Sequence, residues 1–186
     1  MPWQKQLADF LTLTRAPLAM ALVWLGFTRE RSGIEAAWLL LLMAATVDTM
    51  DGYFARIAPG NHKTWVGSND LLFDVLFSMA LLAYLVLAGY VGLLLAAAYL
   101  ALWAMIVFTT SGYANVRAVL FQGPIYLITV FAAGEANGRV YGWTAVWLVI
   151  MLLFAGRRFL NVRLPALLRD FFASVQNFSR RHKKSR

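Results

Sequence analysis

The sequence contains no cysteine and only two histidines in 186 residues. A disulfide, a thiolate metal site and a cysteine nucleophile are therefore excluded. Acidic residues are also scarce, with nine against 17 lysines and arginines, and charged residues of both signs make up only 14% of the chain. Hydrophobic residues, in contrast, make up 61%. This share is well above that of a soluble domain and indicates an integral membrane protein.

Long apolar runs separated by short polar joints predict six transmembrane helices, because a span needs about 20 apolar residues. The expected spans are residues 8–28, 36–57, 69–89, 91–111, 118–134 and 140–157. We expect no cleaved signal peptide, since the first apolar run contains Arg15 and Pro17 and is long enough to span. The predicted fold is thus all-α, with a six-helix transmembrane domain over residues 1–160.

The basic residues predict an orientation. An even number of spans puts both termini on one side, together with 14 of the 17 lysines and arginines. The positive-inside rule places that side in the cytoplasm, as in a multi-pass protein of the bacterial inner membrane. Residues 161–186 combine apolar residues at helical spacing with a basic end, which predicts an amphipathic helix held on the inner leaflet by anionic lipids. We therefore attribute the net charge of +8 to attraction between the basic residues and the anionic membrane surface, and we expect no nucleic-acid partner.

Four of the nine acidic residues lie within 27 positions, in the pairs Asp48/Asp51 and Asp70/Asp74. Each pair lies at the end of an apolar run, where an ionisable side chain marks a functional site. Residues three or four apart share a helix face, so adjacent antiparallel helices can bring both pairs to one site at the cytoplasmic end. With no basic partner expected at this depth, the four carboxylates predict a bound cation. An all-oxygen ligand set favours Mg²⁺ or Mn²⁺, and two such ions would balance the four charges.

The pairs belong to a longer pattern, Asp48-Thr-Met-Asp51-Gly52-Tyr-Phe-Ala55-Arg56 followed by Asp70-Leu-Leu-Phe-Asp74. This pattern resembles the signature of the CDP-alcohol phosphatidyltransferases, and the stretch from Asp9 to Arg15 is similar to one that often opens their first span. The resemblance implies a membrane enzyme that transfers a phosphatidyl group from a CDP-alcohol such as CDP-diacylglycerol to a second alcohol. Such an enzyme releases CMP during phospholipid biosynthesis. Family members are often dimers, so the resemblance allows a homodimer.

The resemblance also implies roles for the matching residues. Asp48, Asp51 and Asp70 would bind metal, while Asp74 would share in metal binding and act as the general base for the acceptor hydroxyl. The residues expected to bind the CDP-alcohol are Thr12, Gly52, Ala55, Arg56 and Gly67. The arginines that could bind a phosphate of the acceptor, or serve instead as cytoplasmic membrane anchors, are Arg15, Arg117, Arg157 and Arg158.

One departure from the family pattern lies between the aspartate pairs. The joint there is one residue longer, so that Val66 stands where the family has glycine, and we expect the neighbouring Gly67 to take its place. A divergent or inactive member of the family is therefore an alternative. The acceptor is open as well: glycerol 3-phosphate suits a chain of this length, and inositol, inositol phosphate, serine and phosphatidylglycerol are alternatives.

Two other classes of function also use intramembrane carboxylates. An intramembrane prenyltransferase would need aspartate-rich motifs on two separate helix pairs, whereas Asp170 is the only aspartate after Asp74. A cation transporter would spread its carboxylates along a path across the bilayer rather than gather them at one end. The sequence favours the transferase over both.

Overall fold

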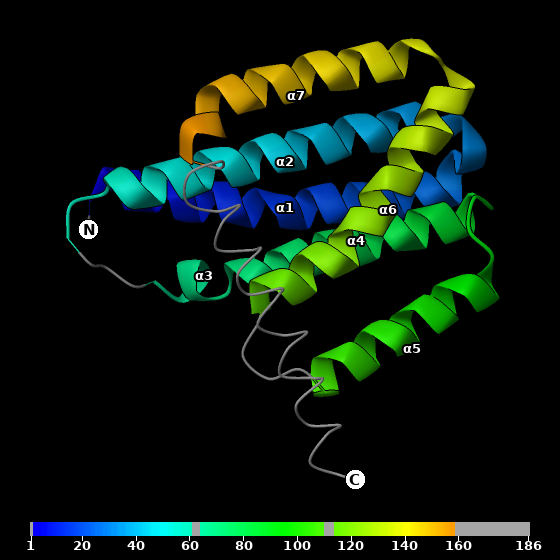
Figure 1. Cartoon of the computed structure of the whole chain (residues 1–186), viewed down its shortest axis with the longest axis horizontal. Helices are drawn as coiled ribbons and strands as arrows, with labels where there is room; N and C mark the ends of the chain where they lie inside the picture. The colour runs from blue at the N-terminus through cyan, green and yellow to red at the C-terminus, as the bar shows by residue number, and fades with distance from the viewer. Residues whose placement is uncertain (1, 61–63, 110–113, 159–186) are drawn as a thin grey trace, which may run out of the picture.

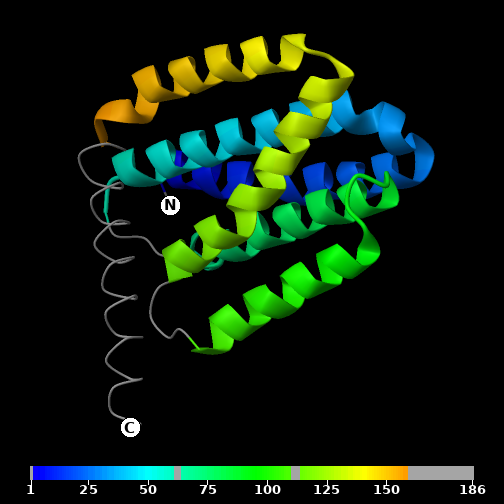
Figure 2. The same ribbon diagram turned by 45° about the vertical axis from the view of Figure 1, so that its right-hand side comes forward.

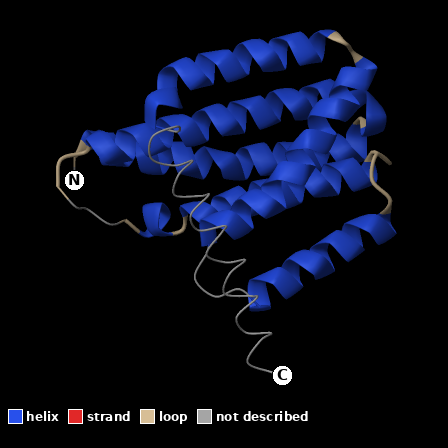
Figure 3. Ribbon diagram, viewed as in Figure 1, coloured by secondary structure: helices blue, strands red, loops and turns tan. Residues whose placement is uncertain are grey.

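Helices dominate this chain because a segment in lipid must pair its backbone polar groups internally. The computed structural model describes residues 2–60, 64–109 and 114–158, and every regular element in these ranges is helical (Figure 1, Figure 3). The elements are α1 (Trp3–Thr28), the 3₁₀ helix η1 (Glu30–Gly33), α2 (Ile34–Ile57), α3 (Trp65–Ser68), α4 (Asp70–Leu87), α5 (Leu93–Thr109), α6 (Ala114–Ala136) and α7 (Arg139–Arg158). The all-α prediction is confirmed.

The six long helices coincide with the six expected spans. The largest difference is at the start of α1, which begins at Trp3 rather than at residue 8. α1, α2, α4 and α6 are long and apolar enough to cross a membrane, whereas α5 and α7 are apolar over the shorter stretches Leu93–Phe108 and Arg139–Phe154. These helices indicate a membrane protein, while the six spans and their topology stay predictions. The predicted amphipathic helix over residues 161–186 lies outside the described residues.

α1, α2 and α4 lie side by side, and α6 crosses over α2 and α4 (Figure 1, Figure 2). α7 runs along α2, and α5 packs against α4 and α6. Large apolar side chains that are fully buried include Leu22 of α1, Phe77 and Leu81 of α4, and Phe121 of α6. The first, second and fourth helices therefore form a packed layer that α6 covers on one side.

One end of the bundle holds the turns between α1 and α2 and between α4 and α5. Arg31 of η1 donates there from Nη2 to the Gly89 carbonyl (2.9 Å) and from Nε to the Ala88 carbonyl (3.3 Å). Its guanidinium lies 5.3 Å from the centre of the Tyr90 ring. Gly89 has a φ of 72°, a left-handed conformation that favours glycine. Backbone carbonyls and one aromatic ring thus hold the two turns together.

The other end of the bundle holds the N-terminus, the end of α2, the short helix α3 and the start of α4 (Figure 1). The joint between α2 and α4 is expected from the sequence to be a loop, but α3 forms within it. The Thr64 side chain accepts a hydrogen bond from the Gly67 N–H (3.1 Å) and so caps this helix. Both aspartate pairs lie at this end.

Candidate functional site

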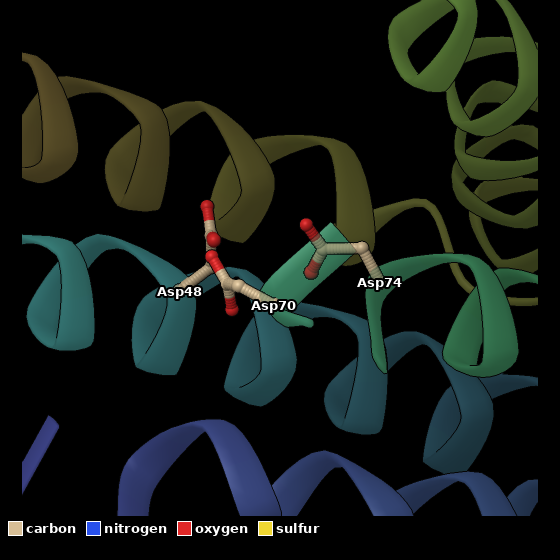
Figure 4. A group of neighbouring side chains, drawn as sticks. All are labelled: Asp48, Asp70 and Asp74. Carbon is tan, nitrogen blue, oxygen red and sulfur yellow. The ribbon is translucent and has the colours of Figure 1, made fainter. Parts of the chain in front are cut away.

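The two aspartate pairs meet where the end of α2 lies against the start of α4. Asp48 and Asp51 lie one turn apart on α2, and Asp70 and Asp74 lie one turn apart on α4. Asp48, Asp70 and Asp74 each offer a carboxylate oxygen, and these three oxygens lie within 4.8 Å of one another (Figure 4). The structure therefore brings the predicted carboxylates together from both helices.

A guanidinium from α1 lies among these carboxylates. Arg15 Nη2 donates to Asp48 Oδ1 and to Asp51 Oδ2, both at 2.8 Å. Its Nη1 donates to Asp70 Oδ1 at 3.0 Å and also to Asp74 Oδ1. The Arg15 side chain is only 2% exposed. The expectation that no basic residue shares the depth of the aspartates is therefore wrong, because α1 packs between α2 and α4 and directs Arg15 into the cluster.

One guanidinium can balance only one of the four carboxylates, so the cluster carries excess negative charge whenever more than one of them is ionised. Arg15 bonds to a single oxygen of each aspartate, and nothing in the described ranges donates to the second oxygen. The side chains of Asp48 and Asp70 are 41% and 42% exposed, whereas that of Asp51 is 5% exposed.

These oxygens suit a divalent cation. Oxygen ligands of one Mg²⁺ lie at most about 4 Å apart, twice the metal–oxygen bond length. The oxygens of Asp48, Asp70 and Asp74 lie within 4.8 Å of one another, so at most small side-chain movements would let them hold one cation. Asp51 does not belong to this group of three. Its Oδ2 accepts hydrogen bonds from Thr12 and Arg15 of α1.

Thr12 lies one turn before Arg15 on the buried side of α1. Its hydroxyl is 3.0 Å from Asp51 Oδ2 and 3.4 Å from Asp70 Oδ1. The hydroxyl also lies 3.2 Å from the carbonyl of Ala8 in its own helix. The structure thus places Thr12 against the aspartates, where it helps to hold α2 and α4 together.

Gly67 of α3 lies against the first turns of α1. Lys5 forms an ion pair with Asp9 (3.2 Å), and Thr64 Oγ1 donates to the same Asp9 carboxylate (2.8 Å). A Cβ atom at Gly67 would lie 2.5 Å from Lys5 Nζ and 3.1 Å from Thr64 Oγ1. Because the atom that would have to move is the flexible end of Lys5, packing alone favours glycine at this position only weakly.

Four further residues expected at the site lie on α2 and α6. Gly52, Ala55 and Arg56 follow Asp51 in the last turns of α2, where Ala55 and Arg56 are exposed. Arg117 of α6 instead donates from Nη1 to the Val107 carbonyl of α5 (3.2 Å) and lines a cavity of about 420 Å³ between α4, α5 and α6. Within the described part of the chain Arg117 forms no ion pair with the aspartates, and its expected role in binding the acceptor stays a prediction.

Arg157 and Arg158 are the last residues of α7. Their side chains lie outside the described part of the chain, so their expected role in binding the acceptor stays a prediction.

Sequence reasoning missed two polar side chains that the structure links to Asp74, Ser78 and Tyr126, and a third, Gln122, on the same helix as Tyr126. Ser78 Oγ donates to the Asp74 carbonyl (2.8 Å) and lies 3.2 Å from the hydroxyl of Tyr126 on α6. Gln122 lies one turn before Tyr126. The signal that could have found them is a polar residue inside an otherwise apolar span, which marks an internal or functional position.

Fold and site together define a helical membrane protein with an acidic centre at one end of its bundle. The family model of the CDP-alcohol phosphatidyltransferases matches residues 5–164, nearly the whole chain, so the chain belongs to this family. Family membership makes it a membrane transferase of substituted phosphate groups, which takes a phosphatidyl group from a CDP-alcohol in phospholipid synthesis. The family generally uses divalent metal ions. The comparisons with curated proteins and with solved structures found no match.

Proposed function

We propose that this protein transfers the phosphatidyl group of CDP-diacylglycerol to an acceptor alcohol, glycerol 3-phosphate in the first instance, and releases CMP. The observation that carries this proposal is the convergence of four carboxylates on a single guanidinium, with three carboxylate oxygens within 4.8 Å. The excess negative charge supports binding of two Mg²⁺ or Mn²⁺ ions. Asp48, Asp70 and Asp74 are the ligands proposed for them, with Asp51 as the buried fourth.

The transfer forms one P–O bond and breaks another. The acceptor hydroxyl oxygen attacks the phosphorus that bears the lipid, and the bond from that phosphorus to CMP breaks, so that CMP leaves with the electron pair. Asp74 accepts the hydroxyl proton, since its carboxylate keeps one oxygen that no described residue uses. Bound divalent cations would supply the positive charge that stabilises the phosphoryl group and the leaving phosphate.

Arg15 organises the site in this proposal. Four carboxylates at close range repel one another, and a planar guanidinium with five N–H donors can bond to all of them at once. Its bonds to Asp48 and Asp51 on α2 and to Asp70 and Asp74 on α4 support this role over that of a ligand for the acceptor phosphate.

The CDP-alcohol would lie beyond the aspartates, at the end of α2. Gly52 and Ala55 leave room there for a flat group beside the helix, and the exposed Arg56 can reach a diphosphate. Thr12 and Gly67 border the same region from α1 and α3. In the predicted topology this end of the bundle faces the cytoplasm, where a soluble acceptor and CMP can exchange.

The test is an assay of CMP release by the purified protein in liposomes, with CDP-diacylglycerol and one acceptor at a time. We expect CMP and the matching phospholipid in equal amounts, with glycerol 3-phosphate, inositol, inositol phosphate, serine and phosphatidylglycerol compared as acceptors. Metal flux across the same liposomes is measured in parallel. Flux without CMP release would support a cation transporter and contradict the proposal.

A further inference from the structure

Helix α6 carries a short polar stripe within an apolar sequence. Gln122 and Tyr126 lie four residues apart and therefore share one face of this helix. α6 crosses over α2 and α4, the two helices that carry the aspartates (Figure 1, Figure 2). The neighbouring Phe121 faces a different way, because its ring stacks on Tyr99 and packs at a tilt against Trp103, both of α5.

The Tyr126 hydroxyl is linked to the backbone of the proposed general base. Ser78 Oγ donates its one proton to the Asp74 carbonyl (2.8 Å), so it accepts the hydrogen bond of 3.2 Å from the Tyr126 hydroxyl. The phenol oxygen then keeps its lone pairs for another donor. Tyr126 lies close enough to Asp74, Asp48 and Arg15 to interact with their charges.

The Gln122 amide has a buried donor group with no hydrogen-bond partner. Among side-chain nitrogen and oxygen atoms in the described ranges, Gln122 Nε2 alone is buried without one. Natural proteins pair nearly all such groups, so an orphaned amide asks for a ligand or another partner. Gln122 is one turn before Tyr126, as Asp74 is one turn before Ser78, and both helices run away from the aspartate end (Figure 1). Gln122 therefore lies one turn nearer the aspartate end of the bundle than Tyr126, whose hydroxyl is hydrogen-bonded to Ser78.

We propose that Gln122 and Tyr126 bind the acceptor alcohol beside Asp74, an inference that rests on the proposed transferase function. The amide N–H would donate to an oxygen of the acceptor, and the phenol oxygen would accept from one of its hydroxyl groups. Both side chains are uncharged, so they suit the hydroxyl-bearing part of the acceptor rather than a phosphate. Ser78 is a positioning residue that fixes the direction of the Tyr126 hydroxyl.

The experiment compares Gln122→Met and Tyr126→Phe with the wild type, in CMP release with CDP-diacylglycerol and whichever of the five acceptors the wild type uses fastest. Loss of one neutral hydrogen bond should raise the acceptor KM about 5- to 10-fold in each variant and leave the CDP-diacylglycerol KM within about 2-fold. Tyr99→Phe is the matched control, because its hydroxyl bonds to the Leu120 and Phe121 carbonyls of α6, on the side facing α5. It should change neither KM.

Thermal unfolding of Gln122→Met separates binding from structure. Replacing an orphaned amide by an apolar group of similar size should leave the unfolding temperature unchanged or raised. A lowered unfolding temperature with an unchanged acceptor KM, or a rise in the CDP-diacylglycerol KM instead, would overturn the acceptor assignment. A wild type that releases no CMP with any of the five acceptors would contradict the proposed function itself, and the acceptor site with it.

Discussion

Arg15 and Arg31 both link the N-terminal part of the chain to α4 or the turn after it, at opposite ends of the bundle. Arg31 donates to the carbonyls of Ala88 and Gly89 and lies over the Tyr90 ring. Arg15 donates to four carboxylates and is almost completely buried. An arginine thus joins helices at each end of the bundle, but Arg31 donates to neutral carbonyls whereas Arg15 donates to carboxylates.

The difference between the acceptors of the two arginines indicates which end of the bundle carries the candidate site. Backbone carbonyls carry no net charge, so the contacts of Arg31 need no further ion and serve only to join two turns. Four ionised carboxylates carry more charge than Arg15 can balance, and holding them close together is costly unless cations or protons complete the balance. One end of the bundle is thus joined by neutral contacts, whereas the other end holds an acidic cluster of a kind that suits a divalent cation.

The largest expected effect comes from removing an aspartate of the cluster. Asp48→Asn or Asp51→Asn should lower CMP release by about 10³-fold or more, because the amide weakens cation binding and several kcal/mol of charge stabilisation are lost. Glu35→Gln is the control, an exposed acid at the Arg31 end of α2, and should retain full activity. Full turnover in either aspartate variant would remove that residue from the metal site.

A somewhat smaller effect is expected at the general base. Asp74→Asn should lower kcat by about 10²- to 10⁴-fold, the usual range for loss of a general base, with CDP-diacylglycerol binding largely intact. Rates of CMP release at saturating substrates, together with binding of CDP-diacylglycerol to the variant, measure the two effects separately. A kcat near that of the wild type would exclude Asp74 from this role.

Exchanging each arginine for lysine tests the comparison itself. Arg15→Lys should lower CMP release by about 10- to 100-fold, because a point charge with three donors cannot replace a planar fork that bonds to four carboxylates. Arg31→Lys should keep its activity and lose at most about 1 kcal/mol of stability, as expected for an exposed polar contact. Equal effects of the two exchanges on activity would contradict the division of the bundle into two kinds of ends.

The smallest effect concerns packing at the aspartate end. Gly67→Val should displace Lys5 from Asp9 and raise the CDP-diacylglycerol KM about 2- to 5-fold, whereas Val66→Gly should change it little. In a Lys5→Met background the effect of Gly67→Val should shrink, since the two side chains compete for the same space. If Gly67→Val has no effect and Val66→Gly improves binding, Val66 occupies the place of the family's glycine instead.

Hydropathy and spacing were sufficient to predict the six long helices and the meeting of the aspartate pairs. Both depend on local patterns: runs of apolar residues define the helices, and separations of three or four residues place Asp48 with Asp51 and Asp70 with Asp74. The direction of the chain through successive helices then brings the end of α2 to the start of α4.

The partners of the aspartates could not be predicted in the same way. Arg15 lies 33 positions before Asp48, and its contact with four carboxylates depends on how far α1 is rotated about its own axis. Tyr126 reaches Ser78 across 48 positions and through the crossing of α6 over α4. Such contacts follow from helix packing, which hydropathy in a single sequence does not determine.

The most direct test of the central claim is the metal dependence of CMP release from CDP-diacylglycerol. The purified protein is treated with excess chelator, assayed, and assayed again after Mg²⁺ or Mn²⁺ is added back. Because Arg15 balances the charge of the four aspartates only in part, the protein should lose all measurable CMP release in chelator and recover it with either ion. Full turnover in excess chelator would contradict the assignment of the four aspartates as a cation site.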